Sequence, residues 1–481
     1  MSILMKDVRA LFPAFFCHLA ATRRPPLLVR PVKRFLPAFL LLTAGLFLAA
    51  FLLPIEIEAV EDQLAGFPDE HVLGHRLRPW ILGFLCLTPA LAALLYILQD
   101  TLDRYVLREF LGALGISFSA VFAIWLIIDL TDKYSDFTES SEGLSMALRF
   151  YGGIFPMIFV ELAPFSLLLA LILALGRLSS HQELVSIIQT GRGVGRLILP
   201  LAAAGALVSL FCFGFNYHWA PWAHGYKESL LREARHGTAS AADSVVYFEN
   251  EARRLWFITS FPYLYNEGAP LQNVVVRSEA PEPENDSILR AESAFWERSS
   301  GDWIFRDVTE EFPNRTLADG SRMPEIRGPF PLLSRSQWPE TPWRLIKPGL
   351  DAENLGIPGL YSWLLSNRDE PWVNRRRFLT QFHYRFAQPF ICLAIVLLAA
   401  PLGIVFSRRS GTSGVAVSVG LCAGIMLLST VSLALGESGY LSPFWAAWST
   451  NLIAFLIALI LIQRRLVGRP IYQTLRRFFP F

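Results

Sequence analysis

The sequence predicts an α-helical integral membrane protein with about eight transmembrane helices and one inserted, extracytoplasmic β domain. Of the 481 residues, 53% are hydrophobic and only 17% are charged, a composition that is typical of a multi-span membrane protein and foreign to a soluble core. Long apolar runs without charged residues approach the roughly 20 residues that cross about 30 Å of hydrocarbon. Between two of these runs lies a long, turn-rich stretch of alternating composition, where we expect the β domain.

The predicted spans follow one another along the chain as charge-free runs. The run 163–176 is short for a span, so we expect its helix to begin earlier and to leave Glu161 at the outer interface. Asp129, Glu161 and Glu437 fall at outer ends of spans, so the span interiors lack the ionisable residues typical of proton- or sodium-driven transport. The runs are 35–54, 79–98, 111–128, 163–176, 197–215, 386–406, 411–436 and 441–462.

Arginine and lysine residues predict the orientation, because they favour the cytoplasmic side of short loops. One orientation places most of them on one side, while the opposite loops, at 56–62 and 132–142 and at Glu437, are mostly acidic. Arg76 and Arg78 run against this rule. We therefore predict that both termini are cytoplasmic. The cytoplasmic set comprises Arg23, Arg24, Arg30, Lys33, Arg34, Arg104, Arg108, Arg177, Arg192, Arg196, Arg408, Arg409, Arg464, Arg465, Arg469, Arg476 and Arg477.

The stretch 216–374 predicts a single extracytoplasmic domain built from strands. Short β-type runs separated by Gly, Pro, Asn or Asp recur in it at near-hairpin spacing. A β-sandwich or jelly roll of about 100 residues fits this pattern best. The expected strands contain 245–248, 255–258, 274–276, 293–296 and 303–305.

Composition argues against nucleic acid, metals and cofactors as ligands. The net charge of +2 is too balanced for nucleic-acid binding. His71 and His75, like His218 and His224, lack a further ligand at zinc spacing. The five cysteines lie in the amino-terminal stretch or in apolar runs, so we interpret them as small hydrophobic residues.

Enzymatic motifs are weak in this chain. The glycine-rich segment 191–195 lacks the Lys-Ser/Thr of a phosphate loop and follows a predicted helix rather than a strand, and no G-x-S-x-G elbow occurs. We therefore expect no nucleotide site and no enzymatic activity in this chain. Gly191 is more simply interpreted as the residue that ends a helix.

The cytoplasmic segment 178–195 is the most informative part of the sequence. Ser180 and Glu183 have the spacing of a capping box at a helix start, and Leu184, Ile187 and Ile188 then form an apolar stripe. Such a helix lies in the membrane interface or docks in the groove of a partner protein. On the residues alone, a docking helix and a membrane-hugging connector both remain open.

Five short motifs, in order along the chain, carry a resemblance to a known family. Over about 102–466, the chain resembles the LptF/LptG (YjgP/YjgQ) permeases of lipopolysaccharide export. The motifs are Leu102-Asp103-Arg104-Tyr105, Ala163-Pro164 with Leu175-Gly176-Arg177-Leu178, Glu183-Leu184 followed by Gly191, Ala400-Pro401-Leu402-Gly403, and Ser442-Pro443 followed by Trp448 and Asn451.

The resemblance implies a fold and a function. The family fold has a core of six transmembrane helices and a periplasmic β-jelly-roll-like domain. Two such permeases pair around a cavity, and a separate LptB-like ATPase docks beneath them. The chain would then be one permease subunit of an ABC-type exporter in the bacterial inner membrane. It would extract lipopolysaccharide, or a similar envelope glycolipid, and pass it to LptC/LptA-like periplasmic bridge proteins.

The resemblance also implies roles for particular residues. The helix at 179–190 becomes the coupling helix, with Ser180, Glu183, Leu184, Ile187, Ile188 and Gly191 at the ATPase contact. The lipid cavity would be lined by 111–128 and 411–436. Lys133 and Arg149 are the candidate lipid-binding residues. Family members tend to carry basic residues near the outer end of the first helix, whereas here Asp129 and Asp132 flank a single Lys133.

We divide the chain into four parts. Residues 1–100 form an extension with two additional spans, which family members typically lack. Residues 101–217 carry three core spans and the coupling helix, 218–375 the β domain with its connectors, and 376–481 the last three core spans and a basic cytoplasmic tail. We expect the extension to be peripheral, so that a chain beginning just before Asp100 keeps most export activity.

The sequence is compatible with two functions. The first is the export permease. The alternative is a membrane-anchored scaffold or mechanotransmission protein whose β domain binds an envelope protein. The sequence does not decide between the LptF-like and LptG-like halves, although the 303–305 segment leans towards the latter, and it does not specify the lipid.

Overall fold

We describe the fold from a computed structural model. It describes residues 35–64, 72–139, 143–189, 191, 193–236, 240–249, 252–262, 269–280, 282, 285–297, 300–316, 322–336, 338–346, 349–368, 371–404 and 411–466. Several residues used for the predicted orientation lie outside this set, namely the basic residues at 23–34, 192, 408–409 and 469–477. The same holds for His71 and Thr190.

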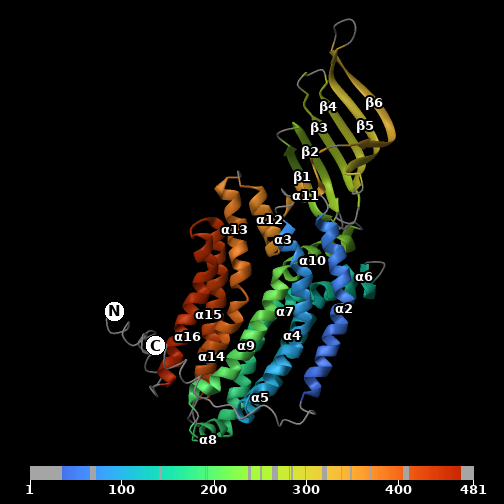
Figure 1. The fold of residues 1–481 in the computed structure, drawn as a ribbon. Coiled ribbons are helices and arrows are strands. Elements are labelled where there is room, and N and C mark those ends of the chain that lie inside the picture. The colour runs from blue at the N-terminus through green and yellow to red at the C-terminus, as the bar shows by residue number, and fades with distance from the viewer. Residues whose placement is uncertain are drawn as a thin grey trace.

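The molecule is elongated, with a helical bundle at one end and a β sheet at the other (Figure 1). Within the described residues, seven helices are long and apolar enough to span a membrane, or up to eight if a bent pair counts as one span. The predicted fold class, an α-helical membrane protein of about eight spans with an inserted β domain, is confirmed. The spanning helices begin with α2 (Leu36–Leu64), α4 (Arg78–Leu98, preceded by α3, Val72–Arg76), α5 (Thr101–Asp132), α7 (Gly143–Ser180) and α9 (Val194–Tyr217) and end with α15 (Gly411–Ser438) and α16 (Pro443–Leu466).

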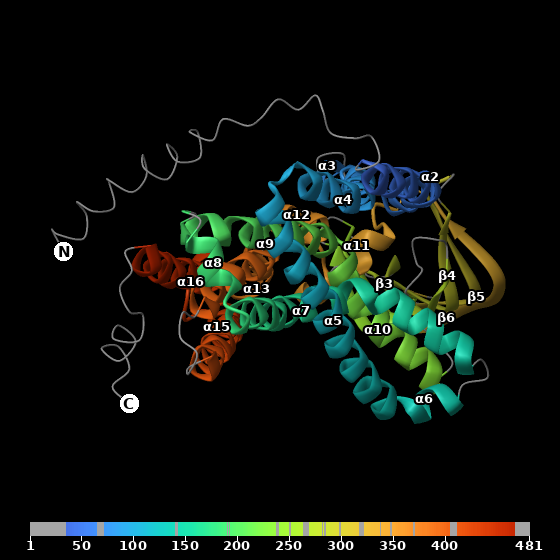
Figure 2. The same ribbon diagram turned by 90° about the horizontal axis from the view of Figure 1, so that it is seen from below.

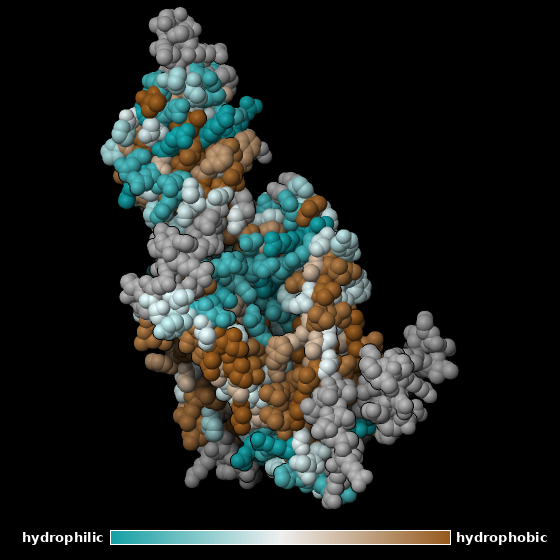
Figure 3. Space-filling view, turned by 180° about the vertical axis from the view of Figure 1, so that it is seen from behind, coloured by the Kyte–Doolittle hydropathy of each residue, from teal (hydrophilic) through white to brown (hydrophobic). Residues whose placement is uncertain are grey.

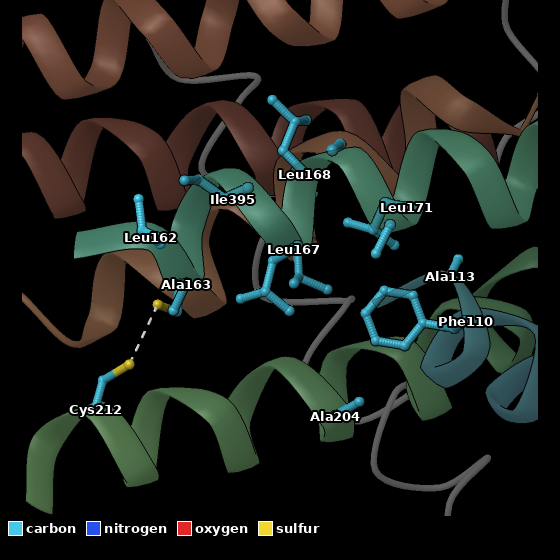
Figure 4. Close-up of a cluster of buried hydrophobic side chains, with 14 of the residues drawn as sticks. Phe110, Ala113, Leu162, Ala163, Leu167, Leu168, Leu171, Ala204, Cys212 and Ile395 are labelled. Atoms are coloured by element: carbon cyan, nitrogen blue, oxygen red, sulfur yellow. Dashed lines mark hydrogen bonds between the residues drawn. The ribbon is translucent and has the colours of Figure 1, made fainter. Parts of the chain in front are cut away.

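Helix α7 lies at the centre of the bundle. It has 38 residues and begins 20 residues before the predicted run at 163–176, which confirms that this helix starts early. Its face carrying Leu167 and Leu171 packs against Phe110 of α5 and Ala204 of α9 (Figure 4). Because α7 contacts helices on several sides, its apolar window is more buried than that of the other six unbroken spans among the described residues.

The predicted span at 386–406 is broken. Within the described residues it covers only the end of α13 (Trp372–Ala387) and the whole of α14 (Phe390–Gly403), and these two helices meet at an angle of 48°. Pro389 lies at the break, where it lacks the N–H that a continuous helix requires. The side chain of Asn451 donates to the carbonyl of Ala387 at 2.6 Å, and the hydroxyl of Ser209 donates to the carbonyl of Pro389. The bond from Asn451 satisfies the Ala387 carbonyl, which a break within lipid would otherwise leave unpaired. The bond from Ser209 adds to the one that the Pro389 carbonyl accepts from the backbone N–H of Cys392 at 3.2 Å.

The β domain is one antiparallel sheet of six strands in chain order, β1 to β6. The five predicted strands are confirmed, but the order is a meander rather than the crossed order of a sandwich or jelly roll. The sixth strand contains Pro324, Pro329 and Pro331, which hid it in the sequence because Pro is tolerated mainly in edge strands. The strands are β1 (Ser240–Glu249), β2 (Arg254–Pro262), β3 (Leu271–Ser278), β4 (Ser287–Glu297), β5 (Asp302–Thr316) and β6 (Arg322–Arg335).

One face of the sheet is closed by the segment that follows β6. Trp256 and Trp303 lie in a buried cluster with Trp343 of α11 (Pro342–Ile346). The fully buried carboxylate of Glu340 accepts hydrogen bonds from Arg254 at 2.7 Å and from the indole of Trp256 at 3.4 Å. The segment therefore fixes its path over the sheet by both apolar and charged contacts.

Two connectors join the sheet to the bundle. The outgoing connector is α10 (Trp219–His236), which follows α9 after a break at His218. The returning connector contains the short helix η7 (Ala352–Asn354) and α12 (Ile357–Ser366), which leads to α13. Helices α2, α3 and α4 lie together along one side of the bundle, next to α9 and α12 (Figure 2).

Candidate functional site

The candidate coupling helix is α8 (Glu183–Gln189), at the end of the bundle farthest from the sheet (Figure 1). The predicted capping box is wrong. Helix α7 continues through Ser180, whose hydroxyl donates to the carbonyl of Arg177 at 2.9 Å instead of capping the next helix. The chain turns at Gln182, which has a positive φ of 58°, and the carbonyl of Gln182 accepts the first backbone bond of α8 from Ser186.

The predicted apolar stripe of α8 is turned inward. Leu184 is 0% exposed and Ile187 is 9% exposed, and both belong to the main core cluster of the bundle. They anchor α8 to its own chain, so they are not available to a partner protein. The side chain of Ile188 lies outside the described set.

A polar face of the same segment is exposed, and the sequence prediction missed it. His181, Gln182, Ser186 and Gln189 present this face to solvent. The positions of Ser186 and Gln189 follow from the 3.6-residue period once Leu184 and Ile187 are known to point inward, whereas His181 and Gln182 lie in the turn before α8. The alternation of polar and apolar residues is visible in the sequence. The sequence does not show which face of the helix is buried. We call these four residues the α8 polar face.

Glu183 connects α8 to the start of α5. Its carboxylate accepts a hydrogen bond from the hydroxyl of Tyr105 at 2.7 Å. Close by in the chain, Arg196 at the start of α9 pairs with Asp100 at 2.5 Å and approaches Asp103 at 3.9 Å. Asp100, just before the 102–105 motif, and Asp103 and Tyr105 within it therefore link the starts of α5, α8 and α9.

Gly191 follows α8 in a left-handed conformation, with φ of 84°. A side chain is strained in that region, whereas glycine adopts it freely. This confirms the prediction that Gly191 ends the helix. Gly191 is also exposed, beside the α8 polar face in the sequence.

The two helices predicted to line the lipid cavity have large exposed apolar faces. Only 11% of the apolar window of α5 and 28% of that of α15 are buried. The exposed side chains include Ile116, Ile124, Ile127 and Ile128 on α5 and Val419, Leu427, Val431 and Leu435 on α15.

The candidate lipid-binding residues are not equivalent. Lys133 forms an ion pair with Asp129 and lies 5.3 Å from the centre of the Phe150 ring, and its side chain is 12% exposed. Tyr151 also donates to Asp129, at 3.1 Å. Arg149 is exposed near the start of α7. The Asp129 carboxylate therefore already compensates the charge of Lys133 within the chain.

A hydrophilic zone lies between the apolar belt of the bundle and the sheet (Figure 3). Near the junction of bundle and connectors, Arg377 of α13 pairs with Asp351 at 3.4 Å and with Glu353 at 3.2 Å, and Gln381 donates to Glu437 at 2.6 Å. These contacts join α13 to η7 and α15.

Arg385 and His224 are two further ionisable side chains near these contacts, and the sequence prediction missed Arg385. Arg385, just before the predicted run at 386, is buried and donates to the side chain of Asn216 at 3.5 Å and to the carbonyl of Glu353 at 2.5 Å. Burial, aided by nearby cations, lowers the pKa of His224 to about 4, so this imidazole is neutral at neutral pH. Its Nε2 atom lies 3.8 Å from Glu161.

No group of three or more His, Cys, Asp or Glu side chains in the described part of the chain could hold a metal ion. Cys86, Cys212, Cys392 and Cys422 are buried as free thiols.

Comparisons with a protein-family model and with a known protein point to the same family. Residues 104–464 match the family described as "Lipopolysaccharide export system permease LptF/LptG". The chain is also 23% identical over 367 residues to the lipopolysaccharide export system permease protein LptG of Haemophilus influenzae. That alignment covers 76% of this chain and 97% of the relative. Helices α2, α3 and α4 precede the residues that match the family.

Proposed function

The chain belongs to the LptF/LptG family of lipopolysaccharide export permeases, and from this premise we propose that α8 is the element through which a separate ATPase drives it. The chain is a transmembrane subunit of the lipopolysaccharide export system, and the ATPase of that system is a different protein. The predicted resemblance and the predicted function are thus confirmed. The partners, the orientation and the coupling residues are proposals.

The single observation that carries the coupling proposal is the construction of α8. It exposes a polar face at one end of the bundle, while Leu184 and Ile187 on its other side are buried in the core. A partner that pushes on the α8 polar face therefore moves side chains packed among the spanning helices, because packed cores transmit displacement. The bond from Tyr105 to Glu183 carries the same displacement to the start of α5.

We propose that α8 faces the cytoplasm and that the sheet lies in the periplasm, with the chain in the bacterial inner membrane and both termini cytoplasmic. Arg177, Arg196, Arg464 and Arg465 support this orientation, since all four lie at the ends of helices on the α8 side. Acidic Glu437 lies at the other end of α15.

We further propose that α5 and α15 face a second LptF/LptG-type permease across a lipid-filled cavity. Their exposed apolar faces support this, because packing within the chain covers little of them. The sheet would receive the lipid and pass it to LptC/LptA-like bridge proteins. Arg149 remains a candidate for contact with lipid phosphates because it is exposed, while Lys133 is the weaker candidate because its side chain is only 12% exposed.

Affinity purification in mild detergent tests the coupling proposal. Ser186→Arg changes the α8 polar face without touching the core, and Ser300→Arg is a matched control at an exposed serine of the β domain. We expect Ser186→Arg to lose most of the copurifying ATPase, since disturbing such a contact costs about 1–3 kcal/mol, and Ser300→Arg to retain it. Equal ATPase recovery from both variants at equal abundance in the membrane would exclude α8 as the coupling element.

A further inference from the structure

Helices α2, α3 and α4 touch both connectors of the β domain. These helices precede the part of the chain that matches the family, and the sequence predicted them to be peripheral. They contact α9, α10 and α12 at the end of the bundle nearest the sheet. The contacts are specific and involve polar groups, which argues against a merely peripheral role.

The outgoing connector is held where α9 gives way to α10. The hydroxyl of Tyr217, the last residue of α9, donates to the carbonyl of Gly74 in α3 at 2.8 Å. The indole N–H of Trp219, the first residue of α10, donates to the carboxylate of Glu56 in α2 at 3.4 Å. Both residues flank the break at His218, so these bonds fix the point at which the chain leaves the bundle.

The returning connector is held by the same short helix. His75 of α3 and Ser362 of α12 are 1% and 0% exposed, and Nε2 of His75 lies 3.3 Å from the Ser362 hydroxyl. Gly74 packs so closely on Pro358 that an added Cβ would lie 3.3 Å from the Cβ of that proline. Helix α3 therefore bridges the outgoing and returning connectors.

A buried ion pair anchors this bridge. Arg78, the first residue of α4, pairs with Glu56 at 2.6 Å, and the two side chains are only 6% and 12% exposed. Arg78 also donates to Gln63 of α2. A buried charge is retained only with a partner, so the pair holds α2 against the start of α4 and presents Glu56 to Trp219. This pairing accounts for one of the two arginines that run against the orientation rule.

We propose that α2, α3 and α4 form a brace that holds the two connectors of the β domain in a fixed relation, and that lipid transfer through this permease depends on it. Arg78 and Glu56 are positioning residues in this brace. The brace lies at the opposite end of the bundle from α8. Its loss therefore reduces the lipid transferred for each ATP hydrolysed and leaves ATP hydrolysis itself in place.

The first test measures both activities in proteoliposomes that contain the full chain, its copurified partners and lipopolysaccharide. Arg78→Met breaks the ion pair while conserving most of the apolar volume. We expect about a tenfold fall in lipid transferred per ATP, within the range of coupling effects between distant sites, with little change in ATP hydrolysis. Thr43→Ala, which removes a hydroxyl bond within α2 alone, is the control and should transfer normally. Normal transfer by Arg78→Met would overturn the proposal.

The second test asks for rescue by a covalent link. Gly74→Cys combined with Pro358→Cys places two thiols on Cβ atoms whose spacing is close to the roughly 3.5–4.5 Å of a disulfide. In the Arg78→Met chain, oxidation of this pair should restore transfer, and dithiothreitol should abolish it again. A complete cross-link without recovery of transfer would show that the ion pair does not act by positioning the connectors.

A third measurement does not depend on the export partners or on the coupling proposal. Spin labels at Ser300→Cys in the β domain and Ser180→Cys at the end of α7 report the distance between sheet and bundle. We expect Arg78→Met to broaden that distance distribution, or Tyr217→Phe to do so if Arg78→Met fails to accumulate. An unchanged distribution in the variant that accumulates would overturn the brace.

Discussion

The bond between Tyr105 and Glu183 offers the sharpest test of how α8 is connected to the spanning helices. Tyr105→Phe removes only the phenolic oxygen, which lies 2.7 Å from the Glu183 carboxylate. The pair is exposed to solvent, so the charge of the acceptor is screened, and the bond is worth about 1 kcal/mol. That energy corresponds to about a fivefold change in an equilibrium constant. We therefore expect about fivefold weaker binding of the ATPase by Tyr105→Phe.

A double-mutant cycle separates this bond from the direct contact with the ATPase that we propose for Glu183. ATPase affinity is measured for the parent chain, Tyr105→Phe, Glu183→Ala and the double variant, all in the same detergent. If Tyr105 acts by ordering Glu183, the double variant should be no weaker than Glu183→Ala alone, with a coupling energy of about 1 kcal/mol. Strictly additive losses would refute the reasoning, because they would show that Tyr105 acts independently of Glu183.

Three further predictions follow from the described contacts. Ile187→Asp buries an unpaired carboxylate at a cost of about 3–5 kcal/mol, so its abundance in the membrane should fall, whereas Ser186→Asp, its exposed neighbour, should accumulate normally; equal abundance would contradict the burial of Ile187. Single cysteines at Asn285 and Ser180 should react with an impermeant reagent from the periplasm and from the cytoplasm respectively, and the reverse pattern would invert the proposed orientation. The lowered pKa of His224, about 4 against an ordinary 6.5, means that the unfolded chain takes up a proton before the folded one. Stability should therefore fall as the pH drops through this window, and thermal unfolding of His224→Gln should show a shallower pH dependence; an identical slope would count against the shift.

Much of the fold follows from the sequence because it depends on local composition. Lipid and water select apolar runs and alternating strands almost independently of which other segments surround them. The spans, the five regular strands and the helix stop at Gly191 are of this kind. The short motifs from Leu102 to Asn451 predicted the family, because their order along the chain can be read from the sequence alone.

The features that the sequence did not determine depend on contacts between distant segments or on the choice of one face of a helix. Ser180 matches a capping box, yet α7 continues through it, because packing along the whole of α7 outweighs a local cap. Likewise Leu184 and Ile187 form an apolar stripe that suits either a partner or the core, and only the packed bundle places it inside. The break at Pro389 needs Asn451 from another helix to satisfy a freed carbonyl.

The ion pair of Arg78 and Glu56 shows most clearly what tertiary structure decides. In the sequence Arg78 is an exception to the orientation rule, and Glu56 is one of several acidic residues in a predicted loop. The apolar runs predicted two additional spans before Asp100, and the structure contains them. Which acid meets Arg78, and which connector meets Gly74, depended on how the helices pack. Such pairing is specified by geometry across the fold, and no local pattern of residues encodes it.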